Sequence, residues 1–159
     1  HHNNMKAIEI NGEIKVYKRL PNSWKGVMGN FSMLSDEEIK AYGFYDVVTP
    51  DYNTKSEKLS DIFWDADQNI FTYNVEDRDL SNITIEELKE SQIKDLKKSA
   101  YIELQKTDWY IWRKTEKNID IPDTISSERD AIREKINTKE SEINALTTKK
   151  DIMEYDKTI

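Results

Sequence analysis

The chain has 159 residues, of which 36% are hydrophobic and 35% are charged. This length suits one domain, or a small domain with a helical extension, and the low hydrophobic share favours an elongated shape or an oligomer. The formal net charge of −7 disfavours binding to nucleic acid or to an anionic membrane surface, and the absence of cysteine excludes disulfides, thiolate metal sites and cysteine nucleophiles.

The first residues resemble a remnant of a purification tag. His1 and His2 precede Met5 without the apolar core of a signal peptide, and we expect the natural chain to begin at Met5. The natural protein would then contain no histidine, which removes the commonest general base and the commonest zinc ligand. No apolar run approaches the roughly 20 residues of a membrane span.

Residues 5–79 predict a small α+β unit that is mostly β. The dipeptide Asn11-Gly12 lies between two apolar runs, and both of its residues tolerate the positive φ of a tight hairpin turn. Ser35 can cap a helix, with Glu38 at the capping-box position. The expected elements are a hairpin over 6–17, a helix from Ser35 to just before Gly43, a strand over 44–48, and a hairpin with strands over 59–64 and 70–75.

Residues 80–159 predict a long helical hairpin that resembles a coiled coil. Thr84 and Glu87 form a capping box, so we expect a first helix over about 84–117, a turn at Pro122 and a second helix over about 124–147. The second helix carries an apolar row with alternating spacings of four and three residues, which is typical of a coiled-coil seam. Its positions are Ile125, Arg129, Ile132, Ile136, Lys139, Ile143, Leu146, Lys150 and Met153. We expect the tail after Leu146 to fray.

No motif in the sequence indicates catalysis, a metal or a cofactor. The segment from Asp65 to Asn69 has oxygen ligands at alternate positions, as calcium loops do, but Ile70 stands where such a loop has glycine. A hairpin turn explains these residues without a metal. The paired carboxylates Glu37-Glu38 and Glu86-Glu87 suit the first turn of a helix. We therefore predict no enzyme activity, no metal and no cofactor.

The aromatic cluster Trp109, Tyr110 and Trp112 is the most unusual local feature. Trp109 and Trp112 are three residues apart and so share a helix face, which could form either a local core or a surface for a protein partner. We favour a packing role for Trp109 and leave Trp112 open. We also expect Arg113 and Glu116 to pair with Asp120 or Arg129 across the turn.

The segment that contains this cluster resembles a known phage motif. It reads Leu104-x-x-Thr107-Asp108-Trp109-Tyr110-Ile111-x-Arg113-x-x-Glu116, followed by Ile121-Pro122, Arg129 and Arg133. It is similar to a C-terminal segment of many phage tail, tail-fibre and tail-fibre-assembly proteins, in which an Ile-Pro turn joins two helices. Weaker similarity lies in Leu20-Pro21-x-x-Trp24, in residues 43–50 and in residues 71–75. The usual glycine before Ile-Pro is missing, and we expect Asn118 to replace it in left-handed geometry.

The resemblance implies a non-enzymatic phage structural or tail-associated protein that works through protein contacts, in the virion or in the host cytoplasm during assembly. One alternative is a tail-fibre assembly chaperone. Another is a carbohydrate- or receptor-binding module that uses the N-terminal aromatics Trp24, Tyr42, Tyr45, Tyr52 and Trp64, of which Trp24, Tyr45 and Trp64 are the leading ligand-facing candidates. We expect a tail or fibre protein as partner, a homo-oligomer through the C-terminal helices, and neither nucleic acid nor membrane. The candidates for partner binding or hairpin packing are Trp109, Tyr110, Trp112, Arg113, Arg129, Ile132 and Ile136.

Overall fold

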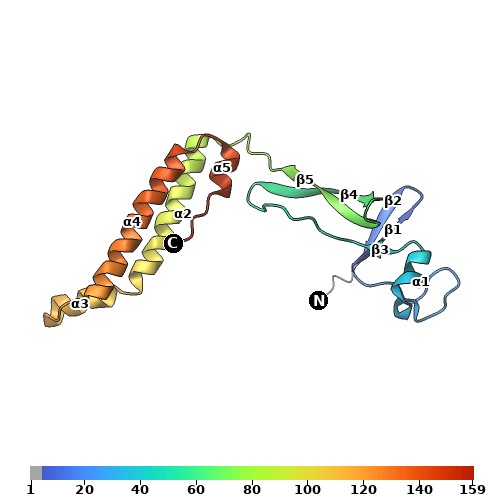
Figure 1. Cartoon of the computed structure of the whole chain (residues 1–159), viewed down its shortest axis with the longest axis horizontal. Coiled ribbons are helices and arrows are strands. Elements are labelled where there is room, and N and C mark those ends of the chain that lie inside the picture. Colours follow the sequence, from blue (N-terminus) through green and yellow to red (C-terminus); the bar gives the residue numbers. More distant parts are fainter. Residues whose placement is uncertain (1–4) are drawn as a thin grey trace. The chain divides into compact units, whose positions relative to one another are not determined.

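The computed structural model describes residues 5–159 and separates a first unit, which ends at Arg78, from a second unit over Asp79–Ile159 (Figure 1). All strands of the described residues lie in the first unit, together with two short helices, and the second unit is helical, so the predicted α+β class is confirmed. The expectation that His1 and His2 belong to a tag lies outside the described residues. Within residues 5–159, no helix is both long enough and apolar enough to cross a membrane.

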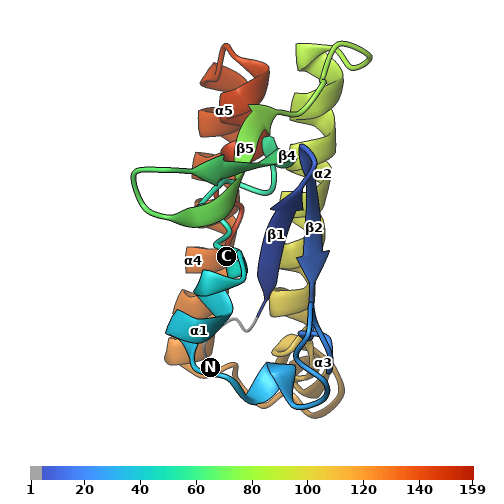
Figure 2. The ribbon, with the colours of Figure 1, turned by 90° about the vertical axis from the view of Figure 1, so that its right-hand side faces the viewer.

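The predicted N-terminal hairpin is present. Strands β1 (Lys6–Ile10) and β2 (Glu13–Tyr17) run antiparallel (Figure 2). Asn11 and Gly12 join them with φ of 54° and 81°, as the turn requires. On the other edge of β1 lies β3 (Tyr45–Asp46), which gives the strand order β2-β1-β3.

Strand β3 is shorter than predicted. Residues 44–48 were expected as one strand, but only Tyr45 and Asp46 pair with β1. Val47 instead forms a parallel bridge with Phe71, and the Val48 backbone N–H donates to the Phe71 carbonyl at 2.9 Å. The chain leaves one sheet for the other at this point, because its backbone groups find partners in strand β5.

The central strand β1 presents its two faces to two apolar clusters. Side chains alternate along a strand, so the neighbouring residues Ala7 and Ile8 point in opposite directions. Ile8 packs with Phe31, Ile39 and Phe44, whereas Ala7 packs with Val47 and Phe71. The first cluster is covered by the short 3-10 helix η1 (Phe31–Met33) and by helix α1 (Asp36–Ala41). The second cluster lies against a separate two-stranded sheet.

Helix α1 begins and ends where its sequence predicts. The Ser35 hydroxyl accepts from the Glu38 backbone N–H at 3.2 Å, and Gly43 follows the helix with φ of 97°. The two-stranded sheet consists of β4 (Glu57–Asp65) and β5 (Ile70–Asp77), which confirms the second predicted hairpin. Both strands extend beyond the predicted bounds.

The predicted single helix over 84–117 is wrong. The structure has α2 (Ile85–Gln105) and α3 (Asp108–Lys117), separated by Lys106 and Thr107. Neither proline nor glycine causes this break. Thr107 adopts φ of −117° and ψ of 6°, and its hydroxyl and backbone N–H both bond to the Leu104 carbonyl. The α2 hydrogen-bond ladder therefore ends on this carbonyl, and a new helix starts at Asp108.

Helix α4 (Asp123–Ala145) lies beside α2 and runs in the opposite direction (Figure 1). Lys89 donates to the Asn144 carbonyl at 2.8 Å, and Lys97 pairs with Glu140 at 3.4 Å. Along α2, every fourth residue from 88 to 100 is buried: Leu88, Gln92, Leu96 and Ala100. On α4 the predicted row is buried or half-buried from Ile125 as far as Leu146.

The expected frayed tail is wrong as well. Residues Lys149–Glu154 form helix α5, which Thr148 caps by accepting from the Asp151 N–H at 3.2 Å. Ile152 is fully buried, and α5 lies beside α2 (Figure 1). The predicted row ends at Leu146, because Lys150 is exposed and Ile152 takes the buried place.

Candidate functional site

The break between α2 and α3 is held by one buried side chain from α4. Arg129 is 7% exposed, and its Nη1 donates to the Leu104 carbonyl at 2.8 Å and to the Thr107 hydroxyl at 2.7 Å. Its Nη2 pairs with Asp108 Oδ1 at 3.0 Å. One guanidinium thus satisfies a carbonyl at the end of α2 and a carboxylate at the start of α3, where helix dipoles favour these charges.

The turn after α3 uses left-handed asparagine, as predicted. Asn118 has φ of 55° and ψ of 32°, and its backbone N–H donates to the Lys114 carbonyl at 2.9 Å. Lys114 also donates to Asp120 at 2.5 Å, and this hydrogen bond and the positive charge hold the pKa of Asp120 below its usual value. The carbonyl of Pro122 then accepts the first backbone bonds of α4.

The ion pairs expected across this turn are wrong. Arg113 and Glu116 were expected to pair with Asp120 or Arg129, but Asp120 pairs with Lys114 and Arg129 pairs with Asp108. Arg113 instead places its guanidinium over the rings of Trp109 and Tyr110, at 5.1 Å and 5.2 Å from their centroids. The arginine is thus used in cation–π contacts within its own helix.

Two exposed tryptophans of α3 and the half-buried side chains beside them form what we call the α3 aromatic face: Trp109, Tyr110, Trp112 and Arg113. Trp109 stacks on Tyr110 with ring centroids 3.8 Å apart, yet Trp109 is 49% exposed and Trp112 is 68% exposed. The expectation that Trp109 packs inside the hairpin is therefore wrong. Because α3 begins anew after the break, its tryptophans do not continue the buried row of α2. None of the α3 residues is fully buried.

The other predicted residues of the second unit have packing roles. Ile132 and Ile136 are half-buried members of the α4 row, in line with the buried Arg129 and Ile143. The structure therefore separates the seven candidates into two groups. Arg129, Ile132 and Ile136 belong to the packing of α4, whereas the four residues of the α3 aromatic face are presented on α3.

The predicted ligand-facing aromatics of the first unit pack against one another. Trp24 meets Phe44 at 4.9 Å between ring centroids, and Trp64 meets Tyr45 at 4.7 Å, both edge to face. Trp24 and Tyr42 border the Phe31–Phe44 cluster, and Tyr45 and Trp64 border the Val47–Phe71 cluster. Tyr52 is also half-buried. This packing disfavours the carbohydrate-binding hypothesis, which needs rings that lie flat on the surface.

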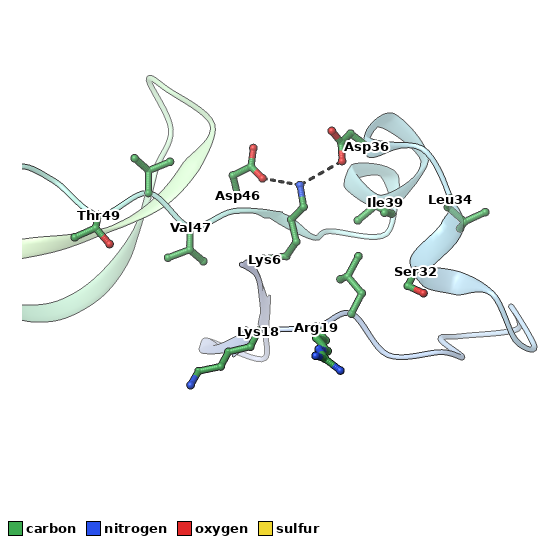
Figure 3. A pocket seen from close by; sticks show the side chains of 12 residues that line it. Lys6, Lys18, Arg19, Ser32, Leu34, Asp36, Ile39, Asp46, Val47 and Thr49 are labelled. Carbon is green, nitrogen blue, oxygen red and sulfur yellow. Dashed lines mark hydrogen bonds and ion pairs between the residues drawn. The ribbon is translucent and has the colours of Figure 1, made fainter. Parts of the chain in front are cut away.

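A hollow of about 1090 Å³ in the first unit surrounds an ion-paired lysine that the sequence did not suggest (Figure 3). Lys6 donates to Asp46 at 2.5 Å and to Asp36 at 3.3 Å. Burial acts to lower the pKa of Lys6, but the hydrogen bonds and charges of both aspartates outweigh it and raise the pKa. Lys18 and Arg19 point away from this group in Figure 3, so the cations do not converge on one ligand position.

The acidic turn that resembles a calcium loop is a hairpin turn. Asp65 Oδ1 accepts from the backbone N–H groups of Asp67 at 3.0 Å and Gln68 at 3.3 Å, and Asn69 has φ of 53°. Over residues 5–159, no group of three or more His, Cys, Asp or Glu side chains is placed to hold a metal ion.

Comparison with models of protein families, with curated proteins and with solved structures gives no match to this chain.

Proposed function

We propose that the protein is a phage structural, tail-associated protein that binds other proteins and carries out no catalysis. The observation that supports this most strongly is the exposure of Trp109 and Trp112 on α3. Tryptophan, tyrosine and arginine are the residues most enriched at the energetic centres of protein interfaces. The α3 aromatic face combines all three types within five residues of one helix.

The face is held in a fixed arrangement before any partner arrives. Arg129 anchors the first residue of α3, and the stacking of Trp109, Tyr110 and Arg113 restricts their side-chain rotamers. Binding then costs less conformational entropy than it would for mobile side chains. This favours a role as a docking surface over a role as a loose surface helix.

The charges around the face are balanced, although the whole chain is acidic. The basic residues Lys106, Arg113, Lys114 and Lys117 are matched by the acidic residues Glu103, Asp108, Glu116 and Asp120. Another acidic protein, or a second copy of this chain, therefore meets less electrostatic repulsion here than the formal net charge of −7 would suggest.

The paired helices α2 and α4 support the finer part of the proposal, a coiled-coil-like helical hairpin that can form a homo-oligomer. The alternating four–three row of α4 is typical of a coiled coil, and its half-buried members Ile132 and Ile136 leave part of the row accessible to a second copy. In this proposal the partner is a tail or fibre protein, and the chain acts in the virion or in the host cytoplasm during assembly.

Co-purification with the tail-fibre protein of the same phage, the partner that we propose, tests the proposal. We expect the wild-type chain to retain the fibre protein and a Trp109→Ser, Trp112→Ser variant to lose it. A Met28→Ser, Met33→Ser variant is the matched control, because both methionines are highly exposed but lie in the first unit. Equal retention by all three proteins, or by none, contradicts the proposal.

The same co-expression experiment distinguishes the chaperone alternative. A chaperone raises the soluble yield of the fibre protein, and purified particles then need not contain the chain. A structural component is found in purified particles and leaves fibre solubility unchanged. The exposed aromatic face suits either role, since both need a docking surface.

A further inference from the structure

The C-terminal strap, residues 149–159, is held on α2 and α4 by one apolar anchor and several polar contacts. Ile152 is fully buried. Lys149 donates to the Leu80 carbonyl at 2.8 Å, and Lys157 donates to Asp95 at 3.0 Å. From α4, Lys139 donates to the Asp156 carbonyl at 2.7 Å. A six-residue helix such as α5 is not stable alone, so docking maintains it.

The buried Gln92 fixes where the strap docks. It occupies a position in the α2 row where apolar residues stand on either side, and it is 7% exposed. Its Nε2 donates to the Ile152 carbonyl at 2.6 Å, and its Oε1 accepts from Lys157 at 2.9 Å. Both polar groups of this amide are therefore satisfied by the strap while it is docked, as buried polar groups require. The groove is thus shaped for this segment.

The same sequence also suits a second arrangement of the strap. Leu146, Lys150 and Met153 continue the four–three spacing of the α4 row. A helix that ran straight from α4 through Thr147 and Thr148 would place these residues on the row. The structure instead bends at Leu146, where ψ is 145°, and buries Ile152. The folded-back and straight arrangements therefore use different faces of the strap.

The geometry points to exchange of the C-terminal strap between two copies of this chain. Residues 80, 92 and 95 contact residues 149, 152 and 157 in ascending order, so α5 runs parallel to α2 and antiparallel to α4. A straight α4–α5 helix that delivered its strap to another copy would lie antiparallel to that copy's α4. A two-fold axis generates this arrangement. Because α4 ends near the start of α2, straightening also carries the strap out of its own groove.

This inference deepens the self-association part of the proposed function and rests on it, but it does not need the phage origin or the α3 aromatic face. Every strap contact described above is made with α2, α4 or Leu80. Each can therefore form unchanged when the strap comes from a second copy.

Single-cysteine chains test the exchange directly, because the chain has no cysteine of its own. Asp95→Cys and Lys157→Cys are placed on separate chains, refolded together and oxidised, and the linked peptides are identified by mass spectrometry. We expect a cross-chain disulfide between positions 95 and 157. The same experiment with Asp95→Cys and Lys58→Cys chains measures the yield of cross-chain disulfide that random collision produces. If the yield of the disulfide between positions 95 and 157 does not exceed this level, the exchange is wrong.

Two hinge variants separate exchange from other self-association. Lys149→Pro should favour the folded-back strap, because proline is tolerated in the first turn of α5 but interrupts a straight helix. The double variant Thr147→Ala, Thr148→Ala should favour the straight helix, because alanine has a higher helix propensity than threonine and cannot cap α5. Its association constant for dimerisation, measured by light scattering, should rise roughly tenfold. Lys149→Ala controls for the lost side chain. If Lys149→Pro dimerises as well as Lys149→Ala, strap exchange is wrong, although self-association and partner binding would stand.

Discussion

Arg129 donates a 2.7 Å hydrogen bond to the hydroxyl of Thr107, and the same guanidinium pairs with Asp108. A side chain of α4 thereby fixes the point at which α2 stops and α3 starts. This relationship links Thr107 and Asp108 to Arg129, which lies on another helix. Trp109 follows Asp108, so the junction fixes where this tryptophan lies on α3. The contacts that hold the junction come from Arg129.

Removal of Arg129 should destabilise the second unit strongly. Arg129→Ala leaves Asp108 and the Leu104 carbonyl without their buried partner, and should lower the free energy of unfolding by about 3 kcal/mol or more. Arg133→Ala is the control, since its exposed pair with Asp130 contributes less than about 1 kcal/mol. Urea unfolding measures both. Similar small losses for the two variants would show that the junction does not depend on Arg129.

The left-handed Asn118 gives a second prediction. Asn118→Gly should leave stability nearly unchanged, because glycine adopts positive φ without strain. Asn118→Ala should lower the free energy of unfolding by about 1 kcal/mol, because alanine lacks the short polar side chain that lets asparagine tolerate this conformation. Thermal unfolding of the two variants compares them under equal conditions. A more stable alanine variant would contradict the left-handed cap.

Local signals in the sequence predicted the elements that local chemistry determines. Asn11-Gly12, the Ser35 cap and the Thr84 cap each gave a correct start or turn, because their hydrogen bonds reach only a few residues along the chain. The α4 row was also predictable, since a helical spacing is a property of one segment. Asn118 was predictable because few residues tolerate its backbone geometry.

The sequence did not predict the features that depend on distant contacts. The break at Thr107 depends on Arg129, which lies on another helix. The signal in the sequence was weak: Arg129 is one of three basic residues, with Lys139 and Lys150, in a row otherwise made of apolar side chains. The ordered strap was missed because Gln92 and Lys157 are residue types usually found at the surface. The burial of Lys6 likewise depends on Asp36 and Asp46, which are remote in sequence.

The exposure of the tryptophans can be measured without a partner. Trp109→Phe with Trp112→Phe should remove most of the fluorescence that acrylamide quenches, since Trp24 and Trp64 are packed in clusters. The stability of this variant should change by no more than about 0.5 kcal/mol, as expected for surface substitutions. Strong quenching that persists in the double variant would place the exposed rings in the first unit.

Docking of the C-terminal strap should change the titration of Tyr155. Burial, together with the hydrogen bond to Glu142, raises the pKa of Tyr155 from 10.0 to about 12. The neutral phenol is favoured in the folded state, so this stability is fully present below pH 10 and is lost as the pH rises through about 12. Ultraviolet titration of the wild type and of Tyr155→Phe should reveal one late-ionising tyrosine. A difference curve between the two proteins with its midpoint near the ordinary pKa of 10.0 would contradict the docked strap.

The most direct test of the central claim is the affinity of the chain for the tail or fibre protein that we propose as its partner, measured with and without the α3 tryptophans. Trp109→Ser with Trp112→Ser should weaken binding by about thirtyfold or more, the effect of losing an energetic centre of an interface. Met28→Ser with Met33→Ser should bind like the wild type. Unchanged affinity in the tryptophan variant would contradict the assignment of the α3 aromatic face as the partner-binding surface.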